Sequence, residues 1–349
     1  MSGLKKLCES ISDDLKLRFP DQRLTQRRKL SELVSAMLMC QTPNLMELSN
    51  VLDRPCDSIE ARYNYVERFL KNELVNHEEV MRNYSKDLLL KLSQSQDRLF
   101  LMIDQSKINE DLELLMISVR VNKRALPIFW MCKETKGAIG FKEQKKILEV
   151  VKSWLPINSK VLLAGDRFYG SKKLIEWCQN NNWQYRLRLK GSFIINQDNK
   201  SQKTLNQLES DNVKYLEKAE MKLGITTDIG ILYEKGHREP WFIAMDSKPT
   251  KLKILDYAKR WGIENMFSDF KSRGFSLMNS KIKFADRLQR LVMIASIAFH
   301  WAVSVGMFKK NSKISIKNQD PVYQFLNVVY VNSCNILHWI KDHRLYGVL

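Results

Sequence analysis

Four residues with reactive or charged side chains are spaced so that one regular helix would present them together. They are Tyr257, Arg260, Glu264 and Lys271. At 100° per residue the last three lie at about 300°, 340° and 320° from the first, within one narrow stripe. A carboxylate is a hard oxygen ligand for Mg²⁺, and arginine and lysine bind phosphate oxygens. The stripe suits a site that holds metal and phosphate together; the alternative is a solvated helix face with i,i+4 charge pairs.

Two further carboxylates follow apolar runs that are predicted to be strands. The runs RLFLMID and KVLLAGD end on Asp104 and Asp166. Because α/β proteins commonly place ligands at the carboxyl ends of strands, the two side chains are expected near each other. Together with a carboxylate from a helix they would hold two divalent ions, the arrangement used for in-line phosphoryl displacement. For each aspartate alone, the alternative is a turn residue or a helix cap.

Composition indicates a folded protein with an anionic partner. The chain has 349 residues, of which 44% are hydrophobic, and it carries eight tryptophans. This length allows two or three domains, or one large core with insertions. The formal net charge is +18, spread along the chain. Such a charge attracts polyanions, so nucleic acid is the leading partner and an anionic membrane surface is the second.

The cysteine pattern and the apolar segments indicate in which cellular compartment the protein is expected. Six cysteines form no CxxC pair, which favours reduced thiols in the cytosol. The N-terminus has no apolar stretch typical of a secretion signal. Residues 291–308 carry no formal charge, but His300 and two serines dilute the run, so a buried core helix is preferred to a membrane span.

Cys334, His338 and His343 offer three zinc ligands without a fourth nearby.

The front of the chain is predicted to be helical. Helices are expected over 28–39, over 44–52 and after Ser58, which is a suitable N-cap. Two short helices joined by a tight turn, the second carrying Arg62 and Arg68, would form a helix-turn-helix DNA reader. An ordinary helical bundle is the alternative. The polar stretch KLSQSQD, residues 91–97, is predicted to be a linker.

From residue 98 the pattern becomes that of a mixed α/β sheet. Three meandering strands, with a hairpin turn at Asn122, are followed by a helix, a strand, a helix and a strand. Arg186, Arg188 and Lys190 alternate along the last strand and are expected to line one face as a phosphate track, or else to form a solvated edge. Residues 191–240 are polar and turn-rich and are interpreted as a β-rich insertion.

Several short motifs together resemble the IS4 family of DDE transposases. The matching pieces are I-D-Q-S at 103–106, L-P-I-F-W at 126–130, D-R-F-Y-G at 166–170, Y-R-L-R-L-K at 185–190, P-W-F-I-A at 240–244 and the Tyr-x2-Arg-x3-Glu-x6-Lys signature at 257–271. The resemblance implies an α/β fold with a ribonuclease-H-like mixed sheet core, a β-rich insertion and a helical N-terminal DNA-binding domain. The implied divisions are 1–95 for DNA binding, 96–190 and 249–310 for the two parts of the core, 191–248 for the insertion and 311–349 for a C-terminal helical region.

The resemblance also implies roles for individual residues. Asp104, Asp166 and Glu264 would hold two Mg²⁺ ions, for which Mn²⁺ can substitute. Phosphate contacts would come from the signature residues and from nearby cations, which are Tyr257, Arg260, Lys271, Arg167, Arg186, Arg188 and Lys190. Trp241 would stack on a flipped base, although a tryptophan before an apolar strand also packs well in a core.

The implied activity is that of a bacterial transposase in the cytoplasm, at the nucleoid when bound to DNA. It would bind the terminal inverted repeats of its element as a homodimer, cleave a DNA strand and join the exposed 3′-hydroxyl to target DNA, in a cut-and-paste reaction. The alternatives are an inactive or domesticated relative that only binds DNA, and a general nuclease with the same core. No membrane partner is expected.

Overall fold

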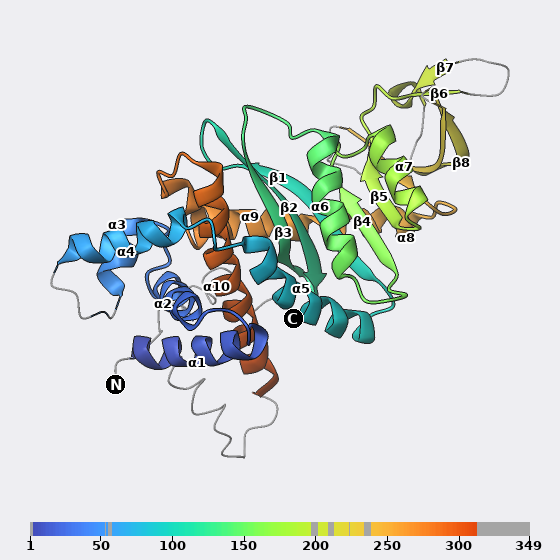
Figure 1. Cartoon of the computed structure of the whole chain (residues 1–349). Coiled ribbons are helices and arrows are strands. Elements are labelled where there is room, and N and C mark those ends of the chain that lie inside the picture. The colour runs from blue at the N-terminus through green and yellow to red at the C-terminus, as the bar shows by residue number, and fades with distance from the viewer. Residues whose placement is uncertain are drawn as a thin grey trace.

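The computed structural model describes residues 3–52, 54, 58–196, 202–208, 213–222, 224–233 and 239–312 (Figure 1). Residues 313–349 lie outside this part of the chain, and so do the candidate zinc ligands Cys334, His338 and His343 and the C-terminal helical region beyond residue 312.

The first hundred residues are helical, as the sequence predicts. The helices are α1 (Gly3–Arg18), α2 (Leu24–Cys40), α3 (Leu45–Val51), α4 (Ile59–Lys71) and α5 (His77–Ser95). Ser58 caps α4 by accepting from the backbone N–H of Ala61, as expected. The predicted linker is wrong, because α5 continues to Ser95 with Leu89 and Leu92 buried.

The tight turn of a helix-turn-helix is not found between α3 and α4. Residues 52–58 separate the two helices, so the connection is longer than a tight turn. Tyr65 of α4 donates to the carboxylate of Glu32 in α2 at 2.7 Å, and the guanidinium of Arg54 lies 3.7 Å from the centre of the Tyr65 ring. These contacts are those of a helical bundle, and DNA binding by this region stays a prediction.

The predicted order of strands and helices in the core is confirmed. The elements are β1 (Leu99–Lys107), β2 (Leu112–Val121), β3 (Arg124–Glu134), α6 (Phe141–Trp154), β4 (Val161–Gly165), α7 (Lys172–Asn180) and β5 (Gln184–Arg188). In space the strands run β3-β2-β1-β4-β5, with β2 antiparallel to β1 and β4 parallel to both β1 and β5. Asn122 turns the β2–β3 hairpin at φ 55°, a left-handed conformation that asparagine tolerates. This mixed sheet is consistent with a ribonuclease-H-like fold.

The strands of the predicted insertion extend the same sheet. They are β6 (Ile194–Asn196), β7 (Gln202–Thr204), β8 (Val213–Met221), β9 (Ile225–Leu232) and β10 (Trp241–Met245). β10 pairs antiparallel with β5, so that Ile243 lies opposite Arg188 and Met245 opposite Arg186. The described residues therefore form one ten-stranded sheet that runs from the core into the insertion without a break.

After β10 the chain returns to helices of changing pitch. These are α8 (Lys251–Leu255), a 3₁₀ segment η3 (Asp256–Arg260), α9 (Trp261–Ser268), a π-helical turn η4 (Asp269–Arg273), a 3₁₀ turn η5 (Leu277–Asn279) and α10 (Ala285–Ser312). The signature residues at 257–271 thus span three helical geometries. A stripe calculated for one regular α-helix does not describe them, and π-turns are frequent at functional sites.

One hydrophobic interior joins the N-terminal helices to the sheet. Its buried side chains run from Leu7 in α1 to Val303 in α10. Figure 1 shows α5 and α6 in front of β1–β3 and α9 behind them. Arg290 of α10 donates to the backbone oxygen of Leu70 in the last turn of α4 at 2.8 Å and to that of Val75 in the loop before α5 at 3.2 Å. The apolar run is core from residue 291 to residue 303, and Ser304 is exposed. No helix in the described part of the chain has the length and apolarity to cross a membrane.

Two histidines in this interior make the fold sensitive to acid. Nε2 of His300 donates to the backbone oxygen of Pro127 at 2.8 Å, and His77 stacks on Phe129 at 5.2 Å between ring centres. Burial lowers the pKa of each to about 4 from the usual 6.5. The unfolded chain therefore takes up these protons first, and the stability that is complete above pH 6.5 is lost as the pH falls towards 4.

We predict that each histidine removes about 2 kcal/mol from the free energy of unfolding between pH 7 and pH 5. Urea denaturation at the two pH values measures the loss. The His300→Gln protein, whose amide can keep the bond to Pro127, should lose about 2 kcal/mol less than the unchanged protein over that interval. An equal loss in both proteins would contradict the assignment to His300.

Candidate active site

The register of two parallel strands brings Asp104 and Asp166 side by side. Ile103 of β1 pairs with Gly165 of β4, and β4 ends there. The next residues, Asp104 and Asp166, therefore leave the pair together at the carboxyl edge. β1 itself continues to Lys107, so Asp104 lies within a strand, where the sequence predicts a strand end. The two carboxylates become neighbours because β4 stops, not because β1 does.

The turn after β4 fixes the carboxylate of Asp166. Its Oδ1 accepts from the backbone N–H of Phe168 at 2.8 Å, and its backbone oxygen accepts from the N–H of Tyr169 at 2.9 Å. Gly165 is required for this turn, because a Cβ at that position would lie 2.7 Å from Cβ of Tyr169. The turn and the hydrogen bond together set the orientation of the Asp166 carboxylate.

A buried arginine connects three of the predicted site residues. Arg260 is 5% exposed; its guanidinium donates to Oδ2 of Asp104 at 3.2 Å and to the hydroxyl of Tyr257 at 3.1 Å, and it forms an ion pair with Glu264. The side chain of Glu264 is 53% exposed, whereas that of Asp104 is 14% exposed. Arg260 therefore stands between a buried and an exposed carboxylate, with its charge shared by both.

The surroundings of Asp104 disfavour its ionised form. Burial, followed by the charges of Asp166 and Glu264, raises the pKa of Asp104 to about 7 against the opposing effect of Arg260. Burial alone would lower the pKa of Arg260, but the charges of Tyr257, Glu264 and Asp104 raise it above its ordinary value. A further cation beside Asp104 would therefore lower the pKa of that carboxyl and would be bound favourably.

Tyr169 is a residue of this site that the sequence analysis missed. It is 1% exposed, and its hydroxyl has no hydrogen-bond partner in the described part of the chain. Burial, with Asp104 and Asp166 next in effect, raises the pKa of this phenol well above its usual range, so it stays a hydrogen-bond donor. Its position three residues after Asp166 is a usable signal, because the turn brings it back beneath that carboxylate.

A cavity of about 460 Å³ opens beside these residues. Its lining residues are Asp166, Arg167, Arg188, Glu239, Trp241, Tyr257, Arg260, Trp261 and Glu264. Arg167 and Arg188 both approach the carboxylate of Glu239, at 3.6 Å and 4.0 Å. Lys190 is exposed beyond the end of β5, with its ammonium 5.7 Å from the ring centre of Phe168. Arg167 and Arg188, both predicted to contact DNA, therefore line the cavity, and Lys190 does not.

The aromatic wall of the cavity contains Trp261, which the sequence analysis missed, beside the predicted Trp241. Trp241 is 4% exposed and makes edge contacts with Tyr257 and Trp261, at 5.4 Å and 5.8 Å between ring centres. Trp261 is 44% exposed. The accessible ring is therefore that of Trp261, while the burial of Trp241 fits the alternative prediction of a packed core residue.

Lys271 is separated from its three predicted companions. It lies in the π-helical turn η4 and is not part of the cavity lining. Its ammonium instead acts on Glu113: burial raises the pKa of that carboxyl, while Lys107 and Lys271 oppose the rise. The wider turn of a π-helix shifts residues after 268 around the axis, which the single-stripe calculation could not include.

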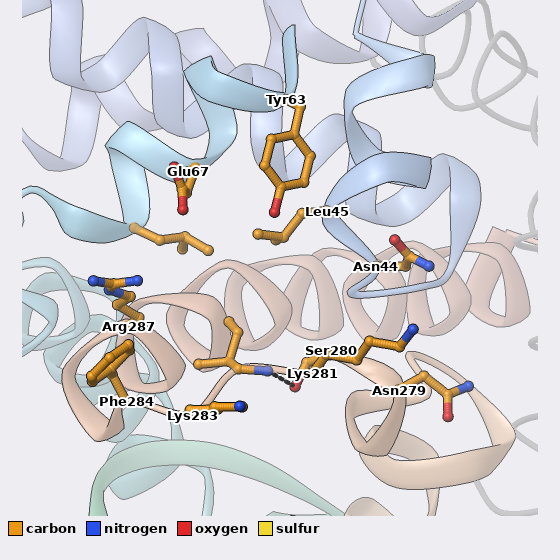
Figure 2. A pocket seen from close by; sticks show the side chains of 12 residues that line it. Asn44, Leu45, Tyr63, Glu67, Asn279, Ser280, Lys281, Lys283, Phe284 and Arg287 are labelled. Carbon is orange, nitrogen blue, oxygen red and sulfur yellow. Dashed lines mark hydrogen bonds between the residues drawn. The ribbon is translucent and has the colours of Figure 1, made fainter. Parts of the chain in front are cut away.

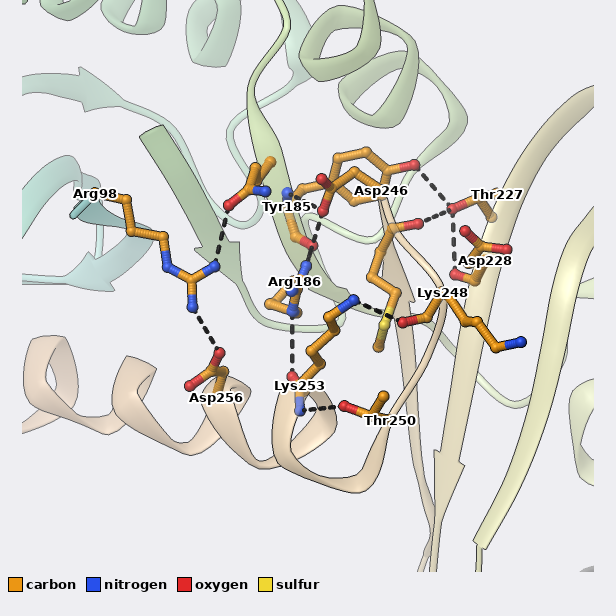
Figure 3. Close-up of polar contacts among 12 residues, drawn as sticks. Arg98, Tyr185, Arg186, Thr227, Asp228, Asp246, Lys248, Thr250, Lys253 and Asp256 are labelled. Atoms are coloured by element: carbon orange, nitrogen blue, oxygen red, sulfur yellow. Dashed lines mark hydrogen bonds and ion pairs between the residues drawn. The ribbon is translucent and has the colours of Figure 1, made fainter. Parts of the chain in front are cut away.

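The prediction that Arg186 belongs to an exposed phosphate track is wrong. Arg186 is 0% exposed; it pairs with Asp246 at 2.9 Å and donates to the backbone oxygen of Lys253 at 3.1 Å (Figure 3). Nearby, Arg98 pairs with Asp256 at 3.0 Å. The buried contacts of Arg186 and the half-buried pair of Arg98, just before β1, tie the sheet to the segment that leads into Tyr257 and Arg260. Arg186 therefore helps to hold the site in place.

The predicted DNA contacts on α4 lie apart from the cavity. Arg62 is half-buried and Arg68 is exposed near the end of that helix. Neither lines the active-site cavity.

The donor set fits a hard divalent cation, although no three acidic, histidine or cysteine side chains in the described residues converge closely enough to hold one as they stand. Asp104, Asp166 and Glu264 supply oxygen ligands only, which Mg²⁺ prefers. Burial, with smaller effects of Asp166 and Glu264, raises the pKa of Asp104, and a bound cation would offset that rise. Arg260 lies between Asp104 and Glu264 and keeps those two carboxylates from a common ligand position.

Part of the chain matches a known protein family. Residues 142–301 match a family model described as a transposase DDE domain, a span that includes Asp166 and Glu264 and begins after Asp104. The match supports a DDE transposase, an enzyme that acts on DNA. No curated protein matches the chain.

Among solved structures, Marinitoga piezophila Argonaute in complex with 5′ OH guide RNA and target DNA aligns at 14% identity with a TM-score of 0.22. The alignment covers 57% of this chain and 29% of the Argonaute chain. A score this low supports no conclusion about the present protein.

We predict that Arg186→Met lowers the free energy of unfolding by about 1–3 kcal/mol, because the backbone oxygens of Tyr185 and Lys253 lose their buried donor. The matched change Arg188→Met, at a side chain 25% exposed, should cost about 1 kcal/mol or less. Chemical denaturation measures both. A weaker DNA affinity of Arg186→Met with unchanged stability would instead restore the phosphate-track interpretation.

Proposed function

We propose that the protein is a DDE transposase of the IS4 type. It binds the terminal inverted repeats of its element, cleaves a DNA strand and joins the exposed 3′-hydroxyl to target DNA in a cut-and-paste reaction. The observation that carries the proposal is the strand register that sets Asp104 beside Asp166, with Arg260 linking Asp104 to Glu264. Acidic side chains gathered beside a cationic cavity suit phosphodiester chemistry better than they suit simple DNA binding.

Asp104, Asp166 and Glu264 would hold two Mg²⁺ ions, for which Mn²⁺ can substitute. When bound, such ions activate water or a 3′-hydroxyl as nucleophile and stabilise the leaving oxygen. Asp104 must be ionised to serve as a ligand, and the neighbouring guanidinium of Arg260 favours that form. For Asp104 and Glu264 to share a ligand, Arg260 has to give up its bond to one of them.

The other residues of the cavity bind and orient DNA in this proposal. Arg260, once released from Glu264, has Tyr257 as a fixed partner and donates to a backbone phosphate beside the cleaved bond. Arg167 and Arg188 exchange their shared contact with Glu239 for phosphate oxygens. Trp261 offers the exposed ring for an unstacked base, a contact worth about 1–3 kcal/mol.

The hydroxyl of Tyr169, which keeps its proton, donates to an oxygen held between Asp104 and Asp166. This role follows from its burial beside two carboxylates without a partner in the described residues. It orients that oxygen without taking part in proton transfer.

We predict a homodimer in the DNA complex, because two element ends have to be paired before they are joined. Sedimentation velocity with and without the terminal repeat DNA measures the assembly. A complex that contains a single protein chain on paired ends would contradict this prediction. The expected setting is the bacterial cytoplasm, at the nucleoid.

We predict that Asp104→Asn, Asp166→Asn and Glu264→Gln each lower Mg²⁺-dependent cleavage of terminal repeat DNA by more than about a hundredfold, because loss of a ligand should cost more than loss of a group that only supports one. Product strands resolved on a denaturing gel give the rates. Asp97→Asn is the matched control, since Asp97 precedes the same strand at its other end with its side chain 85% exposed. DNA affinity should survive in all four proteins.

A transposase, a general nuclease and an inactive relative would give different cleavage products in this assay. Cleavage of unrelated duplexes at the same rate would favour a general nuclease. Binding of the repeats with no cleavage by the unchanged protein at any Mg²⁺ or Mn²⁺ concentration would favour an inactive relative. Full cleavage by the Glu264→Gln protein would refute the assignment of the three carboxylates.

A further inference from the structure

A second cavity lies where the N-terminal helices meet the segment leading into α10. It has a volume of about 280 Å³, with walls from α3 and α4 on one side and from residues 279–287 on the other. In Figure 2, Tyr63 of α4 faces Lys281, Lys283 and Arg287 across this space. None of these side chains lines the candidate active site. The cavity is therefore a separate feature, formed between parts of the chain more than two hundred residues apart.

The backbone of the 279–287 segment directs two lysines outward. Ile282 is 7% exposed, and its backbone oxygen accepts from Nδ2 of Asn109 at 3.0 Å. Its neighbours Lys281 and Lys283 are both exposed, and in the described part of the chain neither has an ion-pair partner. Lys281 has φ 53°, a left-handed conformation that is uncommon for lysine and costs on the order of 1–3 kcal/mol. The segment therefore exposes two adjacent ammonium groups on either side of the buried Ile282.

Charge and ring contacts in the cavity match those that bind nucleic acid. Glu67, the acidic residue of the lining, is already paired with Lys71 at 2.9 Å. Phe284 is 50% exposed, and the guanidinium of Arg287 lies 4.2 Å from its ring centre. Cations beside an accessible aromatic ring bind phosphates and stack against bases or sugars.

The cavity lies at the same end of the sheet as the candidate active site. Asn109, which donates to the backbone oxygen of Ile282, lies two residues beyond the end of β1 and five residues after Asp104. Five residues span at most about 17 Å, the length of about five base pairs of duplex. The segment that carries Lys281 and Lys283 is therefore held within a few base pairs' length of Asp104.

We propose that this cavity binds the phosphodiester backbone of duplex DNA flanking the cleaved bond. Lys281 and Lys283 contact neighbouring phosphates, and Phe284 packs against the adjoining sugar or base. Tyr63 donates its hydroxyl from the opposite wall, so that the N-terminal helices and the catalytic core hold the same stretch of DNA. The identity of the duplex as an element end rests on the proposed function.

The test measures binding of a fluorescent duplex, taken from the repeat flanking the coding sequence, across a range of NaCl concentrations. All proteins carry Glu264→Gln, so that the DNA stays intact. Lys281→Gln with Lys283→Gln should reduce the slope of log K against log[NaCl] by about 1.8 and weaken binding at least about tenfold, because two phosphate contacts are lost. The control is Lys142→Gln with Lys145→Gln, two exposed lysines of α6 with the same change in charge. It should leave the slope unchanged.

Arginine at both positions should restore the slope, and thermal melting by circular dichroism should be the same for every variant. An unchanged slope in the Lys281/Lys283 glutamine protein, or an equal decrease in the α6 control, would overturn the proposal. Absence of cleavage by the unchanged protein, together with the predicted decrease in slope, would refute the transposase activity but leave the cavity as a DNA site. The two proposals therefore fail separately.

Discussion

The candidate site depends on one buried guanidinium. Arg260 supplies a single positive charge to a place where Asp104, Asp166 and Glu264 gather. Burial and the two acidic neighbours all disfavour the ionised form of Asp104, and Arg260 is the main group that favours it. A buried ion whose partner is removed is costly. The hydroxyl of Tyr257 holds the remaining edge of the guanidinium, so the group is fixed on three sides. Arg260 therefore stabilises the carboxylates of Asp104 and Glu264, but it also prevents both from binding one metal ion.

The rest of the structure keeps this guanidinium and the carboxylates in register. Parallel pairing of β1 and β4 sets Asp104 against Asp166, and the contacts of buried Arg186 and half-buried Arg98 hold the segment that carries Arg260. Because β10 pairs with β5, the chain between them returns to the sheet before it turns into α8. The site is therefore assembled from the edge of a sheet and from the helices packed behind it.

Much of this arrangement was predictable because the signals are local. Alternating apolar runs gave the strands, Ser58 gave the start of α4, and Asn122 gave the hairpin. Contacts distant in sequence were not predictable. The two-residue repeat of a β-strand places Arg186 and Arg188 on one face. It does not reveal that Asp246 and the backbone oxygen of Lys253 in α8 bind the guanidinium of Arg186.

Local polarity also misled. The serine- and glutamine-rich stretch after residue 90 continues α5, because Leu92 finds a buried position that composition does not show. Lys271 was misplaced because a change from α- to π-helical pitch leaves no mark in residue type. Trp261 and Tyr169 were missed because exposure of one ring and isolation of one hydroxyl are properties of the folded chain alone.

The continuous interior from α1 to α10 has a consequence for how such a protein can change over generations. A recognition module joined by a flexible tether can be exchanged whole between relatives. Here the front helices share their apolar contacts with the sheet, and Arg290 fastens α4 to α10. Transplanting those helices alone would leave unmatched packing on both sides. The DNA binding proposed for this region would therefore change through single substitutions on exposed faces.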